Sequence, residues 1–242
     1  MCVVREVFER VASKYDLMND VMTAGIHRLW KDQFAAHTHP VNGAKVLDVA
    51  GGTGDIAFRL ISNANKRAVY DYSVTVLDIN EKMLEVGKQR ATQRGLTRGL
   101  SWVVGNAEQL SFPDNTFDVY TVAFGIRNCT HIDKVLSEAY RVLKPGGKFL
   151  CLELSPGAFQ DAPFLKSFYD KYSFEIVPIL GQLFAADRQS YQYLVESIRR
   201  FPDQKKFSEM ITNAKFERVC HENLFNGVAA IHFAWKPKEH AM

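Results

Sequence analysis

The sequence predicts an α/β fold: a doubly wound, mostly parallel sheet covered by helices on both faces. Two observations predict it. From Gly43 onward, short runs rich in β-branched residues alternate with stretches of helical periodicity, which is the βαβα order of such a fold. The first run, KVLDVA at residues 45–50, is apolar almost throughout, as a parallel strand buried on both faces requires. With 242 residues, 47% of them hydrophobic, the chain can bury one substantial core.

The expected elements follow in order along the chain, in a single domain. Residues 1–40 read as a helical N-terminal segment. Residues 43–155 form the alternating core, with further strands expected at SVTVLDI, LSWVVG, FDVYTVAF and KFLCLEL. Residues 156–201 are rich in Phe, Tyr, Ile and Leu at near-helical spacing, which fits either additional core or a helical lid over an apolar pocket. Residues 202–242 contain a closing helix and two strands joined by a turn at Asn226-Gly227.

Composition excludes several classes of function. A formal net charge of +3 lacks the dense basic surface of a nucleic-acid-binding protein, so we expect no nucleic-acid partner. The four cysteines form no C-x-x-C pair, which argues against a metal site or a disulfide framework and favours a reducing compartment. No apolar run reaches the roughly 20 residues of a membrane span. The first residues lack the apolar core of a secretory signal, so we expect a soluble or peripheral protein.

A glycine-rich turn after the first strand indicates a nucleotide or nucleoside ligand. Residues 52–57, GTGDIA, fit the dinucleotide pattern G-x-G-x-x-A between a strand and a helix. However, Asp55 would place a carboxylate where a pyrophosphate should bind, at the start of the helix. A cationic ligand without phosphate, such as S-adenosylmethionine, fits this turn better. An NAD-dependent oxidoreductase using the same turn remains the alternative.

S-adenosylmethionine carries an ammonium group, a sulfonium and a ribose diol, and residues in the right order could bind it. Asp78 ends the second strand, where its carboxylate can accept both ribose hydroxyls. Asn106 and Ala107 follow the third strand, where a side-chain amide and a backbone amide can bind the adenine edge. Asp48 supports the glycine turn from within the first strand. The candidate donor-binding residues are Asp48, Gly51, Gly52, Thr53, Gly54, Asp78, Asn106 and Ala107.

Two long stretches make the chain similar to a known family: YDLMNDVMTAGIHRLW at residues 15–30 and RVLKPGGKFLCLELS at residues 141–155. The sequence resembles the ubiquinone/menaquinone biosynthesis C-methyltransferase family over essentially its whole length. The stretches FGIRN at residues 124–128 and SYQYLVESIRRFP at residues 190–202 resemble its mitochondrial, ubiquinone-making branch. The resemblance implies a class I S-adenosylmethionine-dependent methyltransferase, with a seven-stranded, Rossmann-like sheet whose last strand is antiparallel.

The resemblance also implies a substrate and a setting. The expected reaction is methylation of a ring carbon of a methoxy-polyprenyl-benzoquinol in ubiquinone (coenzyme Q) biosynthesis. Demethylmenaquinone, another lipophilic phenol, or a donor-binding scaffold role are the alternatives. Because each methylene removed from water is worth about 0.8 kcal/mol, residues 156–201 are expected to form an apolar groove for the polyprenyl tail.

The expected location is mitochondrial, peripheral to the matrix face of the inner membrane, with a bacterial cytoplasm as alternative. Other ubiquinone-biosynthesis proteins in a multi-subunit assembly are the expected partners, and a homodimer is an open alternative.

The expected chemistry requires a deprotonated phenol next to the reacting carbon. A phenol with a pKa near ~10 lies about three pH units from neutrality, or roughly 4 kcal/mol. A guanidinium about 4 Å away at an effective dielectric of ~20 supplies energy of that order, and Arg127 is the candidate. Since arginine stays protonated, we expect a water oriented by Arg127 and Asn128, with Asp16 or His27 accepting the proton. Tyr15 is expected to orient the ring.

Overall fold

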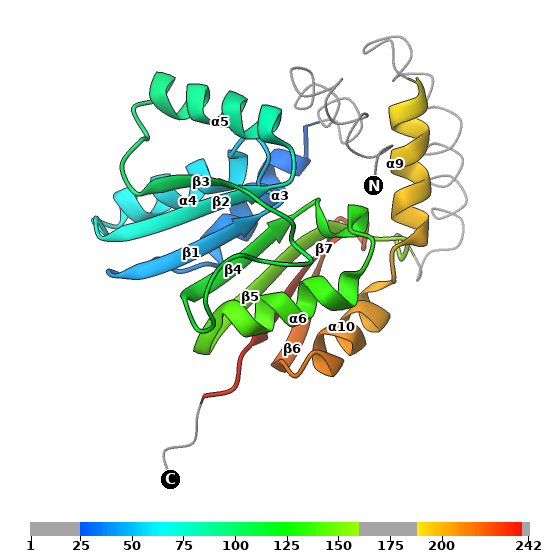
Figure 1. Ribbon diagram of the computed structural model, residues 1–242. Helices are drawn as coiled ribbons and strands as arrows, with labels where there is room; N and C mark the ends of the chain where they lie inside the picture. The colour runs from blue at the N-terminus through cyan, green and yellow to red at the C-terminus, as the bar shows by residue number, and fades with distance from the viewer. Residues whose placement is uncertain (1–24, 160–187, 239–242) are drawn as a thin grey trace.

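The computed structural model describes residues 25–159 and 188–238 (Figure 1). Its centre is a seven-stranded sheet in the order β3-β2-β1-β4-β5-β7-β6. The strands are β1 (Ala44–Val49), β2 (Tyr72–Asp78), β3 (Leu100–Val104), β4 (Phe117–Ala123), β5 (Leu143–Leu154), β6 (Glu217–Leu224) and β7 (Ala229–Trp235). The helices are α3 (His27–Ala36), α4 (Asp55–Lys66), α5 (Glu81–Gln93), α6 (Ile132–Val142), α9 (Arg188–Arg200) and α10 (Gln204–Asn213), with a 3₁₀ turn η1 (Ile126–Asn128).

The sheet has the predicted mixed topology. Strands β1 to β5 pair in parallel, and β7 runs antiparallel to both β5 and β6. Strands β6 and β7 form a hairpin whose connection contains Asn226 and Gly227, both with positive φ. The predicted seven-stranded sheet, with its last strand antiparallel, is therefore confirmed.

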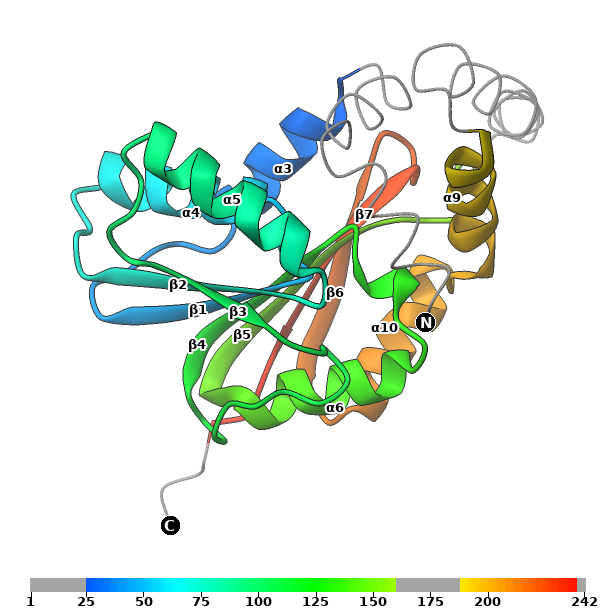
Figure 2. The same ribbon diagram turned by 45° about the horizontal axis from the view of Figure 1, so that its top comes forward.

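Two hydrophobic cores hold the helices on the two faces of the sheet. Helices α3, α4 and α5 lie on one face, and α6 and α10 on the other (Figure 2). Alternate residues of β1 serve the two cores: Val46 packs with Trp30 and Phe34 of α3, whereas Leu47 and Val49 belong to the cluster of α6 and α10. This explains the continuous apolar run of the first strand, because both of its faces are buried.

The chain order creates a crevice at one edge of the sheet. After β1 the chain proceeds outward to β2 and β3, and then returns to place β4 on the other side of β1. Loops leaving the carboxyl ends of β1 and β4 consequently diverge, which is where open α/β sheets bind ligands. The η1 turn follows β4 at this edge, and α9 packs against it.

The remaining sequence predictions fall partly outside the described residues. Of the predicted lid and tail groove, the structure describes residues 156–159 and helix α9, while residues 160–187 lie outside it. The same holds for the first 24 residues of the predicted N-terminal segment. Among the helices that the structure describes, none is long and apolar enough to cross a membrane.

Candidate functional site

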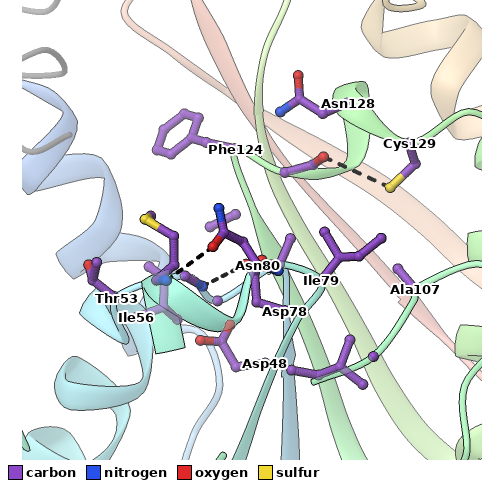
Figure 3. Close-up of a pocket in the computed structure, with 18 of the residues that line it drawn as sticks. Asp48, Thr53, Ile56, Asp78, Ile79, Asn80, Ala107, Phe124, Asn128 and Cys129 are labelled. Atoms are coloured by element: carbon purple, nitrogen blue, oxygen red, sulfur yellow. Dashed lines mark hydrogen bonds between the residues drawn. The ribbon is translucent and has the colours of Figure 1, made fainter. Parts of the chain in front are cut away.

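A cavity of about 380 Å³ opens at the carboxyl edge of the sheet (Figure 3). Its walls come from the loops after β1, β2, β3 and β4 and from Lys31 of α3. The size is typical of a small-molecule site, and the position is the crevice that the strand order creates. Loops far apart in the sequence therefore meet in one cavity.

Asp48 lies at the end of β1 with its carboxylate completely buried. Oδ1 accepts a hydrogen bond of 2.9 Å from the Thr121 hydroxyl, whereas Oδ2 has no hydrogen-bond partner among the described residues. A Cβ at Gly51 would come within 2.9 Å of this Oδ2, so only glycine leaves room above it. Burial, followed by the nearby Asp55 and Asp78, raises the pKa of Asp48 to about 7. An unpaired buried carboxylate oxygen beside a cavity is a binding position for a cation.

Asp78 ends β2 and fixes the glycine turn. Its Oδ2 accepts a hydrogen bond of 2.9 Å from the Gly52 backbone N–H, and Oδ1 accepts one of 2.8 Å from Asn80. Burial raises the pKa of Asp78, and these backbone hydrogen bonds partly oppose that rise. Each carboxylate oxygen has a second lone pair, so the side chain can still accept hydroxyl groups of a ligand.

Thr53 and Gly54 have different roles in the turn. Thr53 lines the cavity, and its hydroxyl accepts a hydrogen bond of 3.1 Å from Arg90. Gly54 is not among the residues that line the cavity. It has φ of +81°, and a Cβ there would lie 2.5 Å from the ring of Trp102. Gly54 therefore supports the turn and its packing on Trp102 without lining the cavity.

The third loop supplies Asn106 and Ala107, which both line the cavity. Asn106 Oδ1 accepts a hydrogen bond of 3.0 Å from the Glu108 N–H, which leaves the amide NH₂ as the free end for a ligand. Ile79 also lines this end of the cavity, although sequence reasoning missed it. Its side chain is 47% exposed despite being apolar. The sequence does offer a signal for Ile79, because an apolar residue that directly follows a strand-ending aspartate lies at the edge of the sheet where ligands bind.

Phe124, Asn128 and Cys129 form the opposite wall (Figure 3). The Tyr193 hydroxyl of α9 donates a hydrogen bond of 3.2 Å to Asn128 Oδ1. This contact turns the amide nitrogen of Asn128 toward the side of Phe124 (Figure 3). Burial raises the pKa of the Cys129 thiol to about 12, so this side chain is a neutral packing group at physiological pH.

Arg127 lies behind this wall and outside the cavity lining. Its guanidinium is 5% exposed and forms a 2.6 Å ion pair with Glu153 Oε1, whose side chain is 1% exposed. The same guanidinium donates hydrogen bonds to the Phe124 carbonyl and to the Ser197 hydroxyl of α9. The sequence predicts a positive charge facing the substrate at this position. In the structure Glu153 offsets that charge.

The remaining catalytic candidates do not meet in the described part of the site. His27 is the first residue of α3 and is buried, but it is not among the residues that line the cavity. Tyr15 and Asp16 lie outside the described residues. Their roles stay predictions.

Asp55, which the sequence places at the start of the helix after the glycine turn, is paired with two cations in the structure. Its Oδ2 lies 2.8 Å from Lys31 Nζ, and its Oδ1 pairs with Arg59 one helical turn away. Burial alone would raise the pKa of Asp55, but Lys31 and Arg59 outweigh burial and lower it. The charge of Asp55 is therefore largely compensated, and the unpaired Asp48 oxygen is the stronger indication of a cationic ligand.

Comparison with known proteins identifies the family. Residues 2–236 match the model of the ubiE/COQ5 methyltransferase family. The chain belongs to this family. It is 57% identical to the mitochondrial 2-methoxy-6-polyprenyl-1,4-benzoquinol methylase of Oryza sativa, over 97% of this chain and 83% of the relative. It is 53% identical to the ubiquinone/menaquinone biosynthesis C-methyltransferase UbiE of Brucella abortus, over 97% of this chain and 85% of the relative.

A solved structure also shares the fold of this methyltransferase. Phosphoethanolamine N-methyltransferase 2 of Haemonchus contortus, in complex with S-adenosyl-L-methionine, matches with a TM-score of 0.58 and 19% identity. The match covers 83% of this chain and 50% of that one. The fold is thus that of S-adenosylmethionine-dependent methyltransferases, as the resemblance implied.

The unusual state of Asp48 leads to a prediction about stability. The pKa of Asp48 is about 7 in the folded protein and near its ordinary value in the unfolded chain. Between about pH 4 and 7 the folded protein therefore holds a proton on Asp48 that the unfolded chain has lost. The free energy of unfolding consequently falls as the pH rises through this range. We expect Asp48→Asn, which keeps the acceptor for Thr121, to remove this fall and to raise the free energy of unfolding at pH 8 by as much as about 4 kcal/mol. Urea unfolding at pH 5 and pH 8 measures it.

The exposed Asp71 provides the matched control, because Asp71→Asn makes the same change of side chain at the surface. If Asp48→Asn is no more stable than the original chain at pH 8, Asp48 is not a strained carboxylate.

Proposed function

We propose that the chain methylates a ring carbon of a methoxy-polyprenyl-benzoquinol in ubiquinone biosynthesis, with S-adenosylmethionine as methyl donor. The observation that carries the proposal is one cavity whose walls combine the strand-end carboxylates of Asp48 and Asp78 with the turn at Phe124 and Asn128. A methyl donor and a methyl acceptor can both bind in such a cavity and meet there. The Oryza sativa relative, 57% identical, is a 2-methoxy-6-polyprenyl-1,4-benzoquinol methylase, which supports the same substrate.

The residues present fit this donor. S-adenosylmethionine supplies a methyl group that its sulfonium makes electrophilic. Asp78 has lone pairs left for the ribose diol, and the Asn106 amide and Ala107 lie where the adenine edge would be read. The unpaired Oδ2 of Asp48 is available for the ammonium group. Ile79 offers an exposed apolar surface for the adenine face.

The charges of the cavity disfavour the oxidoreductase alternative. Its lining contains the carboxylates of Asp48, Asp78 and Glu108, while the fourth carboxylate, Asp55, is paired with Lys31, the one basic side chain among the described lining residues. A dinucleotide would bring two phosphate charges into this acidic surrounding at a large electrostatic cost. A ligand that carries a sulfonium and an ammonium group is instead attracted electrostatically by these carboxylates.

Asn128 is the residue that we assign to the acceptor. The reacting ring carbon becomes nucleophilic as the adjacent phenol loses its proton, so a donor to the phenolate oxygen lowers the barrier. With Oδ1 engaged by Tyr193, the Asn128 amide nitrogen is the end that can donate. Phe124 supplies an apolar surface for the ring beside it.

Arg127 has a different proposed role from the one expected from sequence, which was to stabilise the phenolate by its charge. Paired with Glu153, it contributes a dipole in place of a full charge, and the stabilisation of a phenolate is correspondingly smaller. Its bonds to Phe124 and Ser197 fix the turn that presents Asn128. We therefore assign Arg127 and Glu153 as positioning residues. Asp16 or His27 remains the proposed proton acceptor, with Tyr15 orienting the ring.

The relatives' names also support a setting. The mitochondrial Oryza sativa relative supports a mitochondrial location, and the Brucella abortus relative keeps a bacterial cytoplasm as the alternative. The apolar tail of the proposed substrate favours peripheral contact with the matrix face of the inner membrane, beside other enzymes of ubiquinone synthesis. A homodimer is compatible with this arrangement.

Transfer of an isotopically labelled methyl group tests the reaction. The protein would be incubated with labelled S-adenosylmethionine and a short-tailed methoxy-prenyl-benzoquinone, with and without a reductant, and the label located by mass spectrometry. We expect label on a ring carbon only with the reductant, because only the quinol can form the phenolate. Label on oxygen would contradict the proposed step, and label on carbon without reductant would contradict the quinol requirement.

The role of Asn128 gives a second prediction. Asn128→Ala removes the donor to the phenolate oxygen, and we expect kcat to fall about 100- to 1,000-fold. Affinity for S-adenosylhomocysteine, measured by calorimetry, should stay within about twofold, because the donor residues are untouched. Asn65→Ala, at an exposed position on α4, is the control. A kcat for Asn128→Ala close to that of the control would remove Asn128 from the mechanism.

The buried pair of Arg127 and Glu153 gives a third prediction. Arg127→Met leaves the Glu153 carboxylate buried and unpaired, so we expect a loss of about 3–5 kcal/mol in the free energy of unfolding. The double variant Arg127→Met/Glu153→Leu should recover most of this stability, because no buried charge remains. Its kcat should still be reduced, since the bonds that hold the 126–128 turn are missing.

Urea unfolding and steady-state kinetics on both variants separate the two effects. If the double variant turns over at the original rate, the pair neither positions Asn128 nor supplies charge to the reaction.

A further inference from the structure

The donor's methionine end is a zwitterion, and the cavity as described so far accounts for only one of its two charges. Asp48 offers an unpaired oxygen to the ammonium group. The carboxylate would enter a cavity lined by the acidic side chains of Asp48, Asp78 and Glu108, in addition to the paired Asp55. Without a cation this placement is unfavourable.

Lys31 is the basic side chain among the described residues that line the cavity. It belongs to α3, which packs against α4, and its side chain is 5% exposed. Its Nζ lies 2.8 Å from Asp55 Oδ2 and 6.0 Å from the centre of the Phe124 ring. The ammonium is therefore held between the start of α4 and the segment after β4, beside the glycine turn.

Two observations indicate that Lys31 does more than neutralise Asp55. Asp55 already pairs with Arg59, which also lies 2.9 Å from Asp32, so this carboxylate has a cation without Lys31. In addition, an ammonium group has three N–H donors, and within the described residues the structure assigns one of them, to Asp55. The others are available to a ligand in the cavity.

The start of α4 favours an anion at the same place. Its N-cap is Gly54, and no side chain caps the first turn. The backbone N–H groups of this turn and the positive end of the helix dipole lie beside Lys31 and Asp55. A carboxylate here would gain both the dipole and the lysine, whereas the ammonium of the same ligand is attracted to the buried Asp48.

We propose that Lys31 binds the carboxylate of the methionine end of the donor, so that Lys31 and Asp48 together recognise a zwitterionic α-amino acid. The inference rests on the proposed donor, S-adenosylmethionine, and adds to it a residue that selects the amino-acid part. It predicts that the protein discriminates against ligands that keep the adenosine and the amine but lack the carboxylate.

A pair of ligands that differ by this one group tests the proposal. S-adenosylhomocysteine carries the carboxylate, and S-adenosyl-3-thiopropylamine lacks it while keeping adenosine, thioether and amine. By calorimetry on the full chain, we expect S-adenosylhomocysteine to bind at least tenfold more tightly. Lys31→Met should weaken S-adenosylhomocysteine about 10- to 100-fold, the range for a hydrogen bond to a charged group. Binding of the thiopropylamine should change less than about threefold.

The controls separate ligand binding from packing. Arg59→Met removes the other cation of Asp55 but lies outside the cavity lining, and it should leave the ratio of the two affinities unchanged. Lys31→Arg keeps the charge and should retain most of the discrimination. If Lys31→Met lowers both affinities equally, Lys31 only connects α3 to α4 through its ion pair with Asp55, and the inference is wrong.

The unsubstituted protein supplies an independent measurement, which does not require any variant to fold. Equal affinity for the two ligands would overturn the role of Lys31 while leaving the donor assignment intact. No binding of S-adenosylhomocysteine at all would overturn the donor assignment, and the inference with it.

Discussion

The buried carboxylate of Asp48 is the constraint around which the site is arranged. It lies next to the last residue of β1, with one oxygen bonded to Thr121 of the neighbouring strand and the other unpaired among the described residues. A buried carboxylate with an unpaired oxygen is costly, and the raised pKa of Asp48 expresses that cost. Gly51 above it must lack a side chain, and the turn that follows must stay open. The turn thus requires glycine both because the Asp48 carboxylate lies beneath it and because the proposed ligand would bind above it.

The charges of the site are distributed between compensated and uncompensated groups. Asp55, Arg127 and Glu153 are each paired within the protein and contribute little net charge to the cavity. Asp48 and Asp78 have no basic partner among the described residues and leave the donor side acidic. An ion pair fixes geometry, whereas an unpaired charge attracts a ligand. On this distinction rests our proposal that Asp48 and Asp78 bind the donor, whereas Arg127 and Glu153 position Asn128.

Sequence patterns predicted the features that follow from local order along the chain. The strand-ending Asp78, the turn residue Thr53 and the pair Asn106–Ala107 all line the cavity, because each follows directly after a parallel strand. The mixed seven-stranded sheet was predicted from the family resemblance, whereas the patterns alone predicted a doubly wound parallel sheet. Strand ends in a doubly wound sheet meet at one edge whatever the details of packing, so residues at those ends can be assigned from sequence.

Contacts between distant segments could not be predicted in the same way. Nothing local indicates that Glu153 pairs with Arg127, or that Lys31 reaches Asp55. Sequence patterns therefore do not show that Arg127 and Asp55 are paired, and they do not point to Lys31. Gly54, which the motif assigns to the donor, lies against Trp102 of β3 and does not line the cavity, and its assignment stays a prediction. In each case the pattern identifies the segment, and the tertiary partner is visible only in the structure.

The two walls of the cavity depend on different parts of the fold. Asp48 and Asp78 sit on central strands of the sheet, which hold them rigidly and independently of the helices that follow β5. Asn128 and Arg127 are instead bonded to Tyr193 and Ser197 of α9. A shift of α9 would therefore move the acceptor wall while the donor wall stayed in place. Because methyl transfer requires an in-line approach of the two reactants, our assignment of Asn128 to the acceptor makes the position of α9 relative to the sheet important for the reaction, although none of the described α9 side chains lines the cavity.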